Sequence, residues 1–159
     1  SIANRLKFTL AAVDAAIEVF GADRVGIRLS PVTLANNCPL DSNTNAVYGA
    51  LVDQLAARKI AFIHFIEGNT QVEHSQQGFD FAGARQRFGG AYIANNGYSR
   101  AMALDAVERG AADAVAFGRP FIANPDLPKR LLLDAALNEP NPKTFYKPGP
   151  EGYTDYPAL

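Results

Sequence analysis

Four short apolar segments, each followed by a stretch with helical spacing, constrain the fold of this 159-residue chain more than any other feature. They begin near residues 25, 60, 91 and 112, so the units are 35, 31 and 21 residues long. Repeated strand–helix units of this size predict an α/β fold with a parallel sheet and right-handed crossovers. The second segment, residues 60–66, is apolar except for His64, which is typical of a strand buried on both faces.

The segments between these strands have the periodicity of helices. Residues 4–20 place Leu6, Leu10, Val13, Ile17 and Phe20 on one face, and Gly21 is a natural stop. Further helices are expected over residues 46–59, 79–88, 100–109 and 126–137. Ser99 is expected to cap the helix at 100–109, and Asn124-Pro125-Asp126 the helix that runs to about residue 137. Residues 138–159 contain five prolines and predict an irregular tail that docks on the rest of the chain.

Two α/β architectures are compatible with this order. One is an open doubly wound sheet, and the other is part of an eight-stranded barrel, which needs about 250 residues when complete. The chain has no strand–GxGxxG–helix unit and no Walker lysine motif, so the dinucleotide-binding open sheet is unsupported. Four strands would make half of a (β/α)8 barrel. On the residues alone both architectures stay open, for a domain over residues 1–137 followed by a tail over residues 138–159.

Composition excludes several classes of function. There are 15 basic and 16 acidic residues, and the net charge of −1 argues against binding to nucleic acid. The single cysteine, Cys38, excludes an intrachain disulfide and a cysteine-only metal site, and it fits a reducing, cytoplasmic compartment. No apolar run approaches the roughly 20 residues that span a bilayer, and no signal peptide is visible. The chain begins at Ser1 without a methionine, as expected of a piece of a longer protein.

Candidate site residues follow the strands, because function gathers at the carboxyl ends of strands in such folds. The turns Asn95-Asn96-Gly97 and Phe117-Gly118-Arg119 each place a glycine after a strand, where backbone amides can bind a phosphate; a plain tight turn is equally compatible. Arg28 lies within an apolar strand. It is expected either to form a structural ion pair, with Glu67 or Asp113, or to face an anion.

Other residues with reactive side chains have simpler explanations. His64 is expected to be a hydrogen-bonded core residue, and His74 a solvated one. These histidines with Glu67 or Glu73 fit no metal-site spacing, so no metal site is predicted. Cys38 has no basic neighbour in sequence and is expected to be inert. Most of the tail tyrosines are expected to be packing residues, with one or two facing a site: Tyr146, Tyr153 and Tyr156.

Several longer motifs resemble one family along the whole chain. They are Gly26-Ile27-Arg28-Leu29-Ser30-Pro31, the run from Ala116 to Leu127 (AFGRPFIANPDL), the start SIANR, and the end TFY followed by EGYTDYP. In these motifs the chain is similar to the old yellow enzyme family, which are FMN-dependent ene-reductases on a TIM barrel. The resemblance is closest to bacterial members that reduce N-ethylmaleimide, nitrate esters and 2-cyclohexenone.

The resemblance implies a role for each candidate residue. Arg28 would contact the N1/C2-carbonyl edge of the flavin, where negative charge builds on reduction. The FMN phosphate would be held by Asn95, Asn96 and Gly97 with Phe117, Gly118 and Arg119, and Tyr146 would border the substrate. Residues 32–45 and 67–78 would shape access for substrate and nicotinamide. The second of these loops lacks the aromatic residue of some members, which leaves the substrate preference open.

The resemblance also implies that this chain lacks the catalytic residues. The pair that grips the substrate carbonyl and the tyrosine proton donor belong to the family's N-terminal half, and His64 does not match either. The expected function is therefore the C-terminal half, strands five to eight, of an FMN-dependent NAD(P)H oxidoreductase, inactive without a complementary N-terminal half-barrel chain. Its substrates would be activated alkenes such as 2-enones and maleimides, with nitro compounds or nitrate esters as further candidates. The alternatives are a non-catalytic half-barrel that binds phosphate or self-assembles and, disfavoured by the motifs, a phosphosugar-type barrel enzyme.

Overall fold

The computed structural model describes residues 1–34, 39–68, 76 and 78–159. The chain divides into two compact units, Ser1–Ala116 and Phe117–Leu159, and each is described by itself. The division predicted between residues 137 and 138 stays a prediction.

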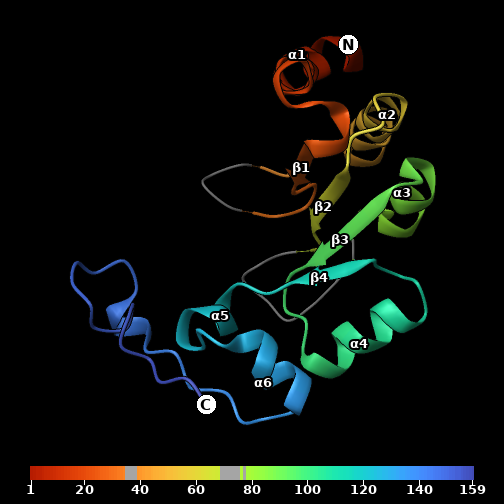
Figure 1. The fold of residues 1–159 in the computed structure, drawn as a ribbon. Coiled ribbons are helices and arrows are strands. Elements are labelled where there is room, and N and C mark those ends of the chain that lie inside the picture. Colours follow the sequence, from red (N-terminus) through yellow and green to blue (C-terminus); the bar gives the residue numbers. More distant parts are fainter. Residues whose placement is uncertain (35–38, 69–75, 77) are drawn as a thin grey trace. The chain divides into compact units, whose positions relative to one another are not determined.

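The first unit is built on a parallel sheet, as the sequence predicts (Figure 1). Its strands are β1 (Gly26–Leu29), β2 (Phe62–Ile66), β3 (Ala91–Asn95) and β4 (Ala114–Ala116). They pair in sequence order, β1-β2-β3-β4, and each pair is parallel. All four carboxyl ends therefore lie along one edge of the sheet, which we call the carboxyl edge.

Helices connect the strands at nearly the predicted positions. They are α1 (Ile2–Phe20), the 3-10 helix η1 (Ala22–Arg24), α2 (Thr44–Ala57), α3 (Phe81–Phe88) and α4 (Arg100–Glu108). Gly21 ends α1 at a φ of 84°, with its N–H donating to the carbonyl of Ile17. The Ser99 side chain accepts from the Met102 amide and caps α4, so both predicted helix signals are confirmed.

The two faces of the sheet differ in how they are covered. Ile63 and Phe65 are fully buried and belong with Tyr92 and Ala94 to the hydrophobic core. We call this side the helix face, since α2 and α3 lie on one side of the sheet in Figure 1. The alternate residues form what we call the second face. The ladder places Arg28 beside His64, and His64 beside Ile93, on this face. Phe62, His64 and Ile66 are only half-buried there, and Arg28 is exposed.

The second unit holds two short helices and the tail. Helix α5 (Arg119–Ala123) begins where a turn was predicted, and α6 (Leu127–Leu133) stops before residue 137, at Asp134 with a φ of 54°. The predicted end of the helix over residues 126–137 is therefore wrong, because α6 ends at Leu133. Asp126 makes no side-chain cap. Its carboxylate instead accepts from Arg130 Nε at 2.7 Å and from the Leu159 amide at 2.8 Å.

The tail, which includes the 3-10 helix η2 (Pro142–Thr144), is docked by side-chain hydrogen bonds. Buried Asn124 accepts from the Asn138 amide at 2.8 Å. The Asn138 side chain donates to the carbonyls of Ala123 and Pro157, each at 2.8 Å, and Arg130 donates to Pro157 at 2.9 Å. The tail thus packs within its own unit, while its approach to an active site stays a prediction.

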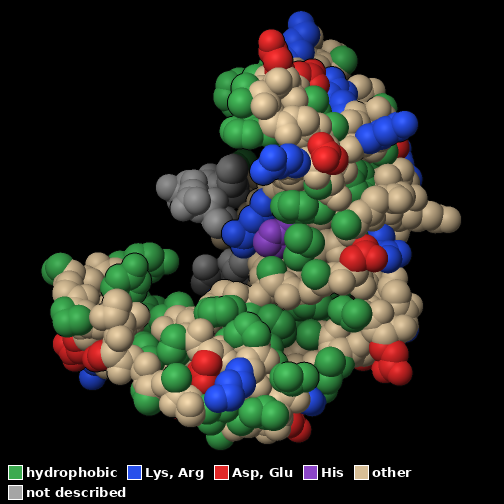
Figure 2. All heavy atoms as spheres, viewed as in Figure 1, with side chains coloured by type: hydrophobic (Ala, Val, Ile, Leu, Met, Phe, Trp, Pro, Cys, Tyr) green, Lys and Arg blue, Asp and Glu red, His purple; other side chains and the backbone are tan. Residues whose placement is uncertain are grey.

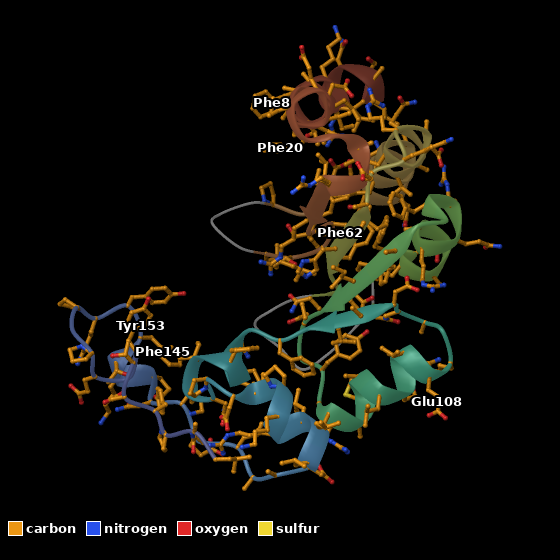
Figure 3. All side chains as sticks on the ribbon, in the orientation of Figure 1. Phe8, Phe20, Phe62, Glu108, Phe145 and Tyr153 are labelled. Atoms are coloured by element: carbon orange, nitrogen blue, oxygen red, sulfur yellow. The ribbon has the colours of Figure 1, made fainter. Side chains whose placement is uncertain are left out.

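Apolar side chains remain at the surface of the first unit. On α1, Phe8 is 85% exposed and Phe20 is 62% exposed, and both project from the helix in Figure 3. Figure 2 shows hydrophobic side chains at the surface in this region as well. The half-covered second face adds Phe62 and Ile66. Exposed apolar side chains that gather into a patch are typical of protein–protein interfaces.

We expect the 159-residue chain, produced by itself, to associate or to bind dyes that report exposed apolar surface. The reason is that β1 and β4 each have one neighbour among the described strands, which leaves two unpaired sheet edges. Light scattering with dye fluorescence checks this. A dye-silent monomer with one sharp unfolding transition would contradict it.

Candidate functional site

The carboxyl edge of the sheet brings two of the predicted site elements together, Arg28 and the turn that begins at Asn95. Arg28, near the end of β1, donates from Nη2 to Asn95 Oδ1 at 3.3 Å. The same amide donates from Nδ2 to the carbonyl of Ala116, at the end of β4, at 2.7 Å. Asn95 therefore links the Arg28 side chain on β1 to the backbone of β4 at Ala116. The turn after β3 begins at the same residue.

Arg28 differs from the structural ion pair that the sequence allowed. In the part of the chain that the structure describes, no carboxylate pairs with it. Asp113 instead pairs with Arg85 at 3.3 Å and accepts from the Tyr92 amide at 2.8 Å. Glu67 bonds to Tyr92, whose ring belongs to the helix face, whereas Arg28 lies on the second face. The pairing with Glu67 or Asp113 is therefore wrong, and the hydrogen-bond partner of Arg28 among the described residues is a neutral amide.

The turn after β3 has a backbone that favours small or amide side chains. Asn96 has a φ of 104° and Gly97 a φ of 70°, both in the region that L residues other than glycine, asparagine and aspartate rarely adopt. Asn96 Nδ2 donates to the Glu67 carbonyl at 2.6 Å, and the Glu67 amide donates to the Asn95 carbonyl at 2.9 Å. The residue that follows β2 thus holds this turn through its backbone.

Glu67 itself was not among the predicted site residues. Its side chain is almost fully buried, with 1% relative exposure. Oε1 accepts from the Tyr92 hydroxyl at 2.5 Å, while Oε2 accepts from the Tyr98 hydroxyl at 2.6 Å and from Gln76 Nε2 at 2.9 Å. The signal that was missed is a carboxylate directly after an apolar strand, which needs donors wherever it is buried.

The two tyrosines of this group stay protonated. Burial is the largest cause that raises the pKa of Tyr92, and the neighbouring Glu67 charge raises it further. Burial, followed by the hydrogen bond to Glu67, likewise raises the pKa of Tyr98. Both hydroxyls are therefore hydrogen-bond donors to the carboxylate rather than acids that lose a proton near neutral pH.

His64 is not the hydrogen-bonded core residue that was predicted. Its Nε2 is buried and has no hydrogen-bond partner among the residues that the structure describes. Burial lowers the pKa of this imidazole, and the Arg28 charge beside it lowers the pKa further. The ring is therefore neutral at neutral pH, so Arg28 is the charged group of this pair.

The remaining predicted residues belong to the second unit. Phe117, Gly118 and Arg119 lie at its start, and Arg119 begins α5. Gly118 has a φ of −106° and a ψ of −72°, and a Cβ there would meet nothing within 4 Å. Neither its backbone nor its packing in this chain requires glycine. Tyr146 is fully exposed, at a φ of 60°.

Two residues from the sequence analysis, Cys38 and His74, lie outside the described residues. Within the described ranges, no group of three His, Cys, Asp or Glu side chains is placed to hold a metal ion. Over the same ranges, no helix has both the length and the apolar character required to cross a bilayer.

Comparison with known proteins supplies the family. The model of the NADH:flavin oxidoreductase / NADH oxidase family matches residues 1–138. A relative from Arabidopsis thaliana, 12-oxophytodienoate reductase 2, is 43% identical over an alignment of 162 positions that covers 100% of this chain and 43% of the relative. A relative from Leishmania infantum, described as "Probable flavin mononucleotide-dependent alkene reductase", is 40% identical over 159 residues, which are 100% of this chain and 42% of the relative.

Solved structures agree with the sequence relatives. Morphinone reductase in complex with tetrahydroNAD superimposes with a TM-score of 0.89 at 45% identity, over 100% of this chain and 42% of that one. The old yellow enzyme from Trypanosoma cruzi gives a TM-score of 0.90 at 34% identity, over 99% of this chain and 41% of that one. The chain thus spans less than half the length of the proteins it matches.

The family match and the relative that is described by its flavin mononucleotide confirm the prediction of FMN as the cofactor. The chain belongs to the NADH:flavin oxidoreductase / NADH oxidase family, the family of the old yellow enzymes, as its motifs predicted.

Proposed function

We propose that this chain is the C-terminal half of an FMN-dependent ene-reductase and contributes strands five to eight of its barrel. Four parallel strands in sequence order and a span of 42% of the morphinone reductase chain support this placement. The observation that carries the proposal is Arg28. It is an exposed cation at the carboxyl edge whose hydrogen-bond partner in the structure is a neutral amide.

The residues of the chain fit FMN in two respects. Arg28 lies on the second face of the sheet, where an interior-facing residue of a barrel lies, and its charge is available to an anionic ring edge. A Cβ at Gly118 would meet no atom of the described residues within 4 Å, and such open space beside the backbone is compatible with a phosphate contact. We assign Arg28 to the N1/C2-carbonyl edge of the flavin, and the turns at Asn95–Gly97 and Phe117–Arg119 to its phosphate.

FMN, when bound, supplies the hydride chemistry between NAD(P)H and an activated alkene. The residues of this chain bind and orient it. Asn95 holds the Arg28 guanidinium by accepting one of its N–H groups, and Asn95 is itself fixed by the Ala116 carbonyl. A positioned cation costs no reorganisation when negative charge develops near it, so it stabilises the reduced state of the cofactor. His64, neutral beside it, adds no second charge to that effect.

The names of relatives support the substrate class that we propose. They include reductases of 12-oxophytodienoate and morphinone and an alkene reductase. We propose activated alkenes such as 2-enones and maleimides, with NAD(P)H as the reductant. The tetrahydroNAD bound to morphinone reductase supports a nicotinamide as that reductant.

Tyr146 is proposed to border the substrate. The groups that grip the carbonyl and donate the proton are proposed to come from the N-terminal half, which makes this half inactive by itself.

Arg28→Leu should lower the reduction potential of the flavin bound to the assembled enzyme. The lost contact is charge-assisted and worth about 1.5–3 kcal/mol. Since about 30 mV corresponds to about 1.4 kcal/mol for a two-electron couple, we expect a fall of some tens of millivolts and slower reduction by NAD(P)H. Redox titration against a reference dye measures it.

The matched control for that experiment is Arg119→Ala. Its proposed partner, the phosphate, keeps the same charge in both redox states, so the potential of the bound flavin should stay nearly constant. Equal shifts in the two variants, or no shift in Arg28→Leu, would show that Arg28 has no role in stabilising the reduced flavin.

Arg119→Ala should weaken FMN much more than riboflavin. A guanidinium–phosphate contact is charge-assisted, and its loss costs about 2 kcal/mol or more, which is about thirtyfold in affinity. Riboflavin lacks the phosphate and should bind almost equally to both proteins. Titration of flavin fluorescence gives both dissociation constants. Equal losses for the two ligands would count against the phosphate assignment.

A further inference from the structure

The buried carboxylate of Glu67 has no part in the flavin contacts proposed above, yet three donors converge on it. The hydroxyls of Tyr92 and Tyr98 bond to it at 2.5 and 2.6 Å, and the side-chain amide of Gln76 bonds to it at 2.9 Å. None of these donors carries a charge. A buried carboxylate is costly unless it is hydrogen-bonded, and this arrangement supplies the bonds from neutral groups.

The donors of Glu67 flank one short segment. Tyr92 lies near the start of β3, and Tyr98 follows Gly97 directly, so the carboxylate is bonded on both sides of the Asn95–Gly97 turn. The main chain of Glu67 bonds to the turn as well. Its N–H donates to the Asn95 carbonyl at 2.9 Å, and its carbonyl accepts from Asn96 Nδ2 at 2.6 Å.

These bonds bear on a strained residue. Asn96 has a φ of 104°, a backbone state that persists only where the surroundings hold it. The bond from its side chain to the Glu67 carbonyl is such a restraint, and the carboxylate in turn restrains Glu67. The turn is therefore held from the β2 side by one residue through its N–H, its carbonyl and its carboxylate.

We propose that Glu67 is a positioning residue, which holds the backbone of the Asn95–Gly97 turn in the shape that receives the flavin phosphate. The inference rests on the proposed function, because it takes this turn as part of the phosphate site. Glu67 acts through Asn95, Asn96 and Tyr98 and does not itself touch the flavin.

The test is Glu67→Gln in the assembled enzyme, with two readouts. The amide keeps the size of the side chain but removes its charge and replaces one acceptor oxygen by an NH2 donor, so at least one of the three bonds donated to Glu67 is reversed or lost. We expect FMN affinity to fall about tenfold while riboflavin affinity changes less than about twofold. In the flavin-free protein, we expect the backbone amides of residues 96–98 to exchange hydrogen about tenfold faster.

Two further variants make the result specific. Tyr98→Phe removes a donor and leaves Glu67 in place, so it should change both readouts in the same direction by a smaller factor. Asp113→Asn is the matched control. This carboxylate accepts from the Tyr92 amide, which lies in the same strand as the turn but near its other end. Asp113→Asn should lower stability without changing the ratio of FMN to riboflavin affinity.

The outcomes separate the two proposals. A wild-type protein that does not prefer FMN to riboflavin would contradict the proposed function itself. If wild type prefers FMN and Glu67→Gln keeps both that preference and the slow exchange, the role of Glu67 is overturned and the proposed function stands. Equal weakening of both flavins would also overturn it, since that marks a general loss of structure. If Glu67→Gln does not fold, an unchanged preference and exchange in Tyr98→Phe overturns the inference.

Discussion

The amide of Asn95 is the interaction on which the carboxyl edge of this sheet depends. One oxygen accepts from Arg28 on β1 and one nitrogen donates to Ala116 on β4, so a single side chain of β3 connects three of the four strands. It does so without a negative charge. A carboxylate at position 95 would also bind Arg28, but it would neutralise the cation that the proposed flavin contact requires.

Asn95 and Glu67 hold the same turn from opposite faces of the sheet. Asn95 lies on the second face with Arg28, whereas the Glu67 side chain bonds to Tyr92 on the helix face. This division follows from the alternation of side chains along a strand. Polar groups proposed to meet the ligand come from the second face. The Glu67 side chain, which is proposed to touch no ligand, bonds on the helix face, where burial makes each unmade hydrogen bond costly.

Sequence reasoning was most accurate where the physical cause is local. Gly21 and Ser99 act at helix ends through their own backbone and side chain, and the apolar run through Ile63 and Phe65 identifies a buried strand. The end of α6 was missed because Asp126 bonds to Arg130 and to the chain end at Leu159, a contact across 33 residues.

Sequence reasoning also failed to predict the partners of charged residues, because those partners are distant in the sequence. By sequence, Glu67 and Asp113 were equally available to Arg28. The contacts of the folded chain show instead that Glu67 bonds to Tyr92 on the helix face and that Asp113 pairs with Arg85. The Glu67 group joins residues that lie 25 and 31 positions apart, so no local pattern identifies it. By contrast, the family and its cofactor were accessible from motifs, because those motifs include a long contiguous run.

The central claim is that this sequence forms half of one flavin-binding barrel. Native mass spectrometry of the purified protein, with its bound small molecules retained, tests that claim most directly. The account predicts a particle that contains this 17.1 kDa sequence together with about 200 further residues, because the chain covers 42% of the morphinone reductase chain, and one FMN. A particle made of this chain alone, whether it binds FMN stoichiometrically or lacks flavin altogether, would contradict it.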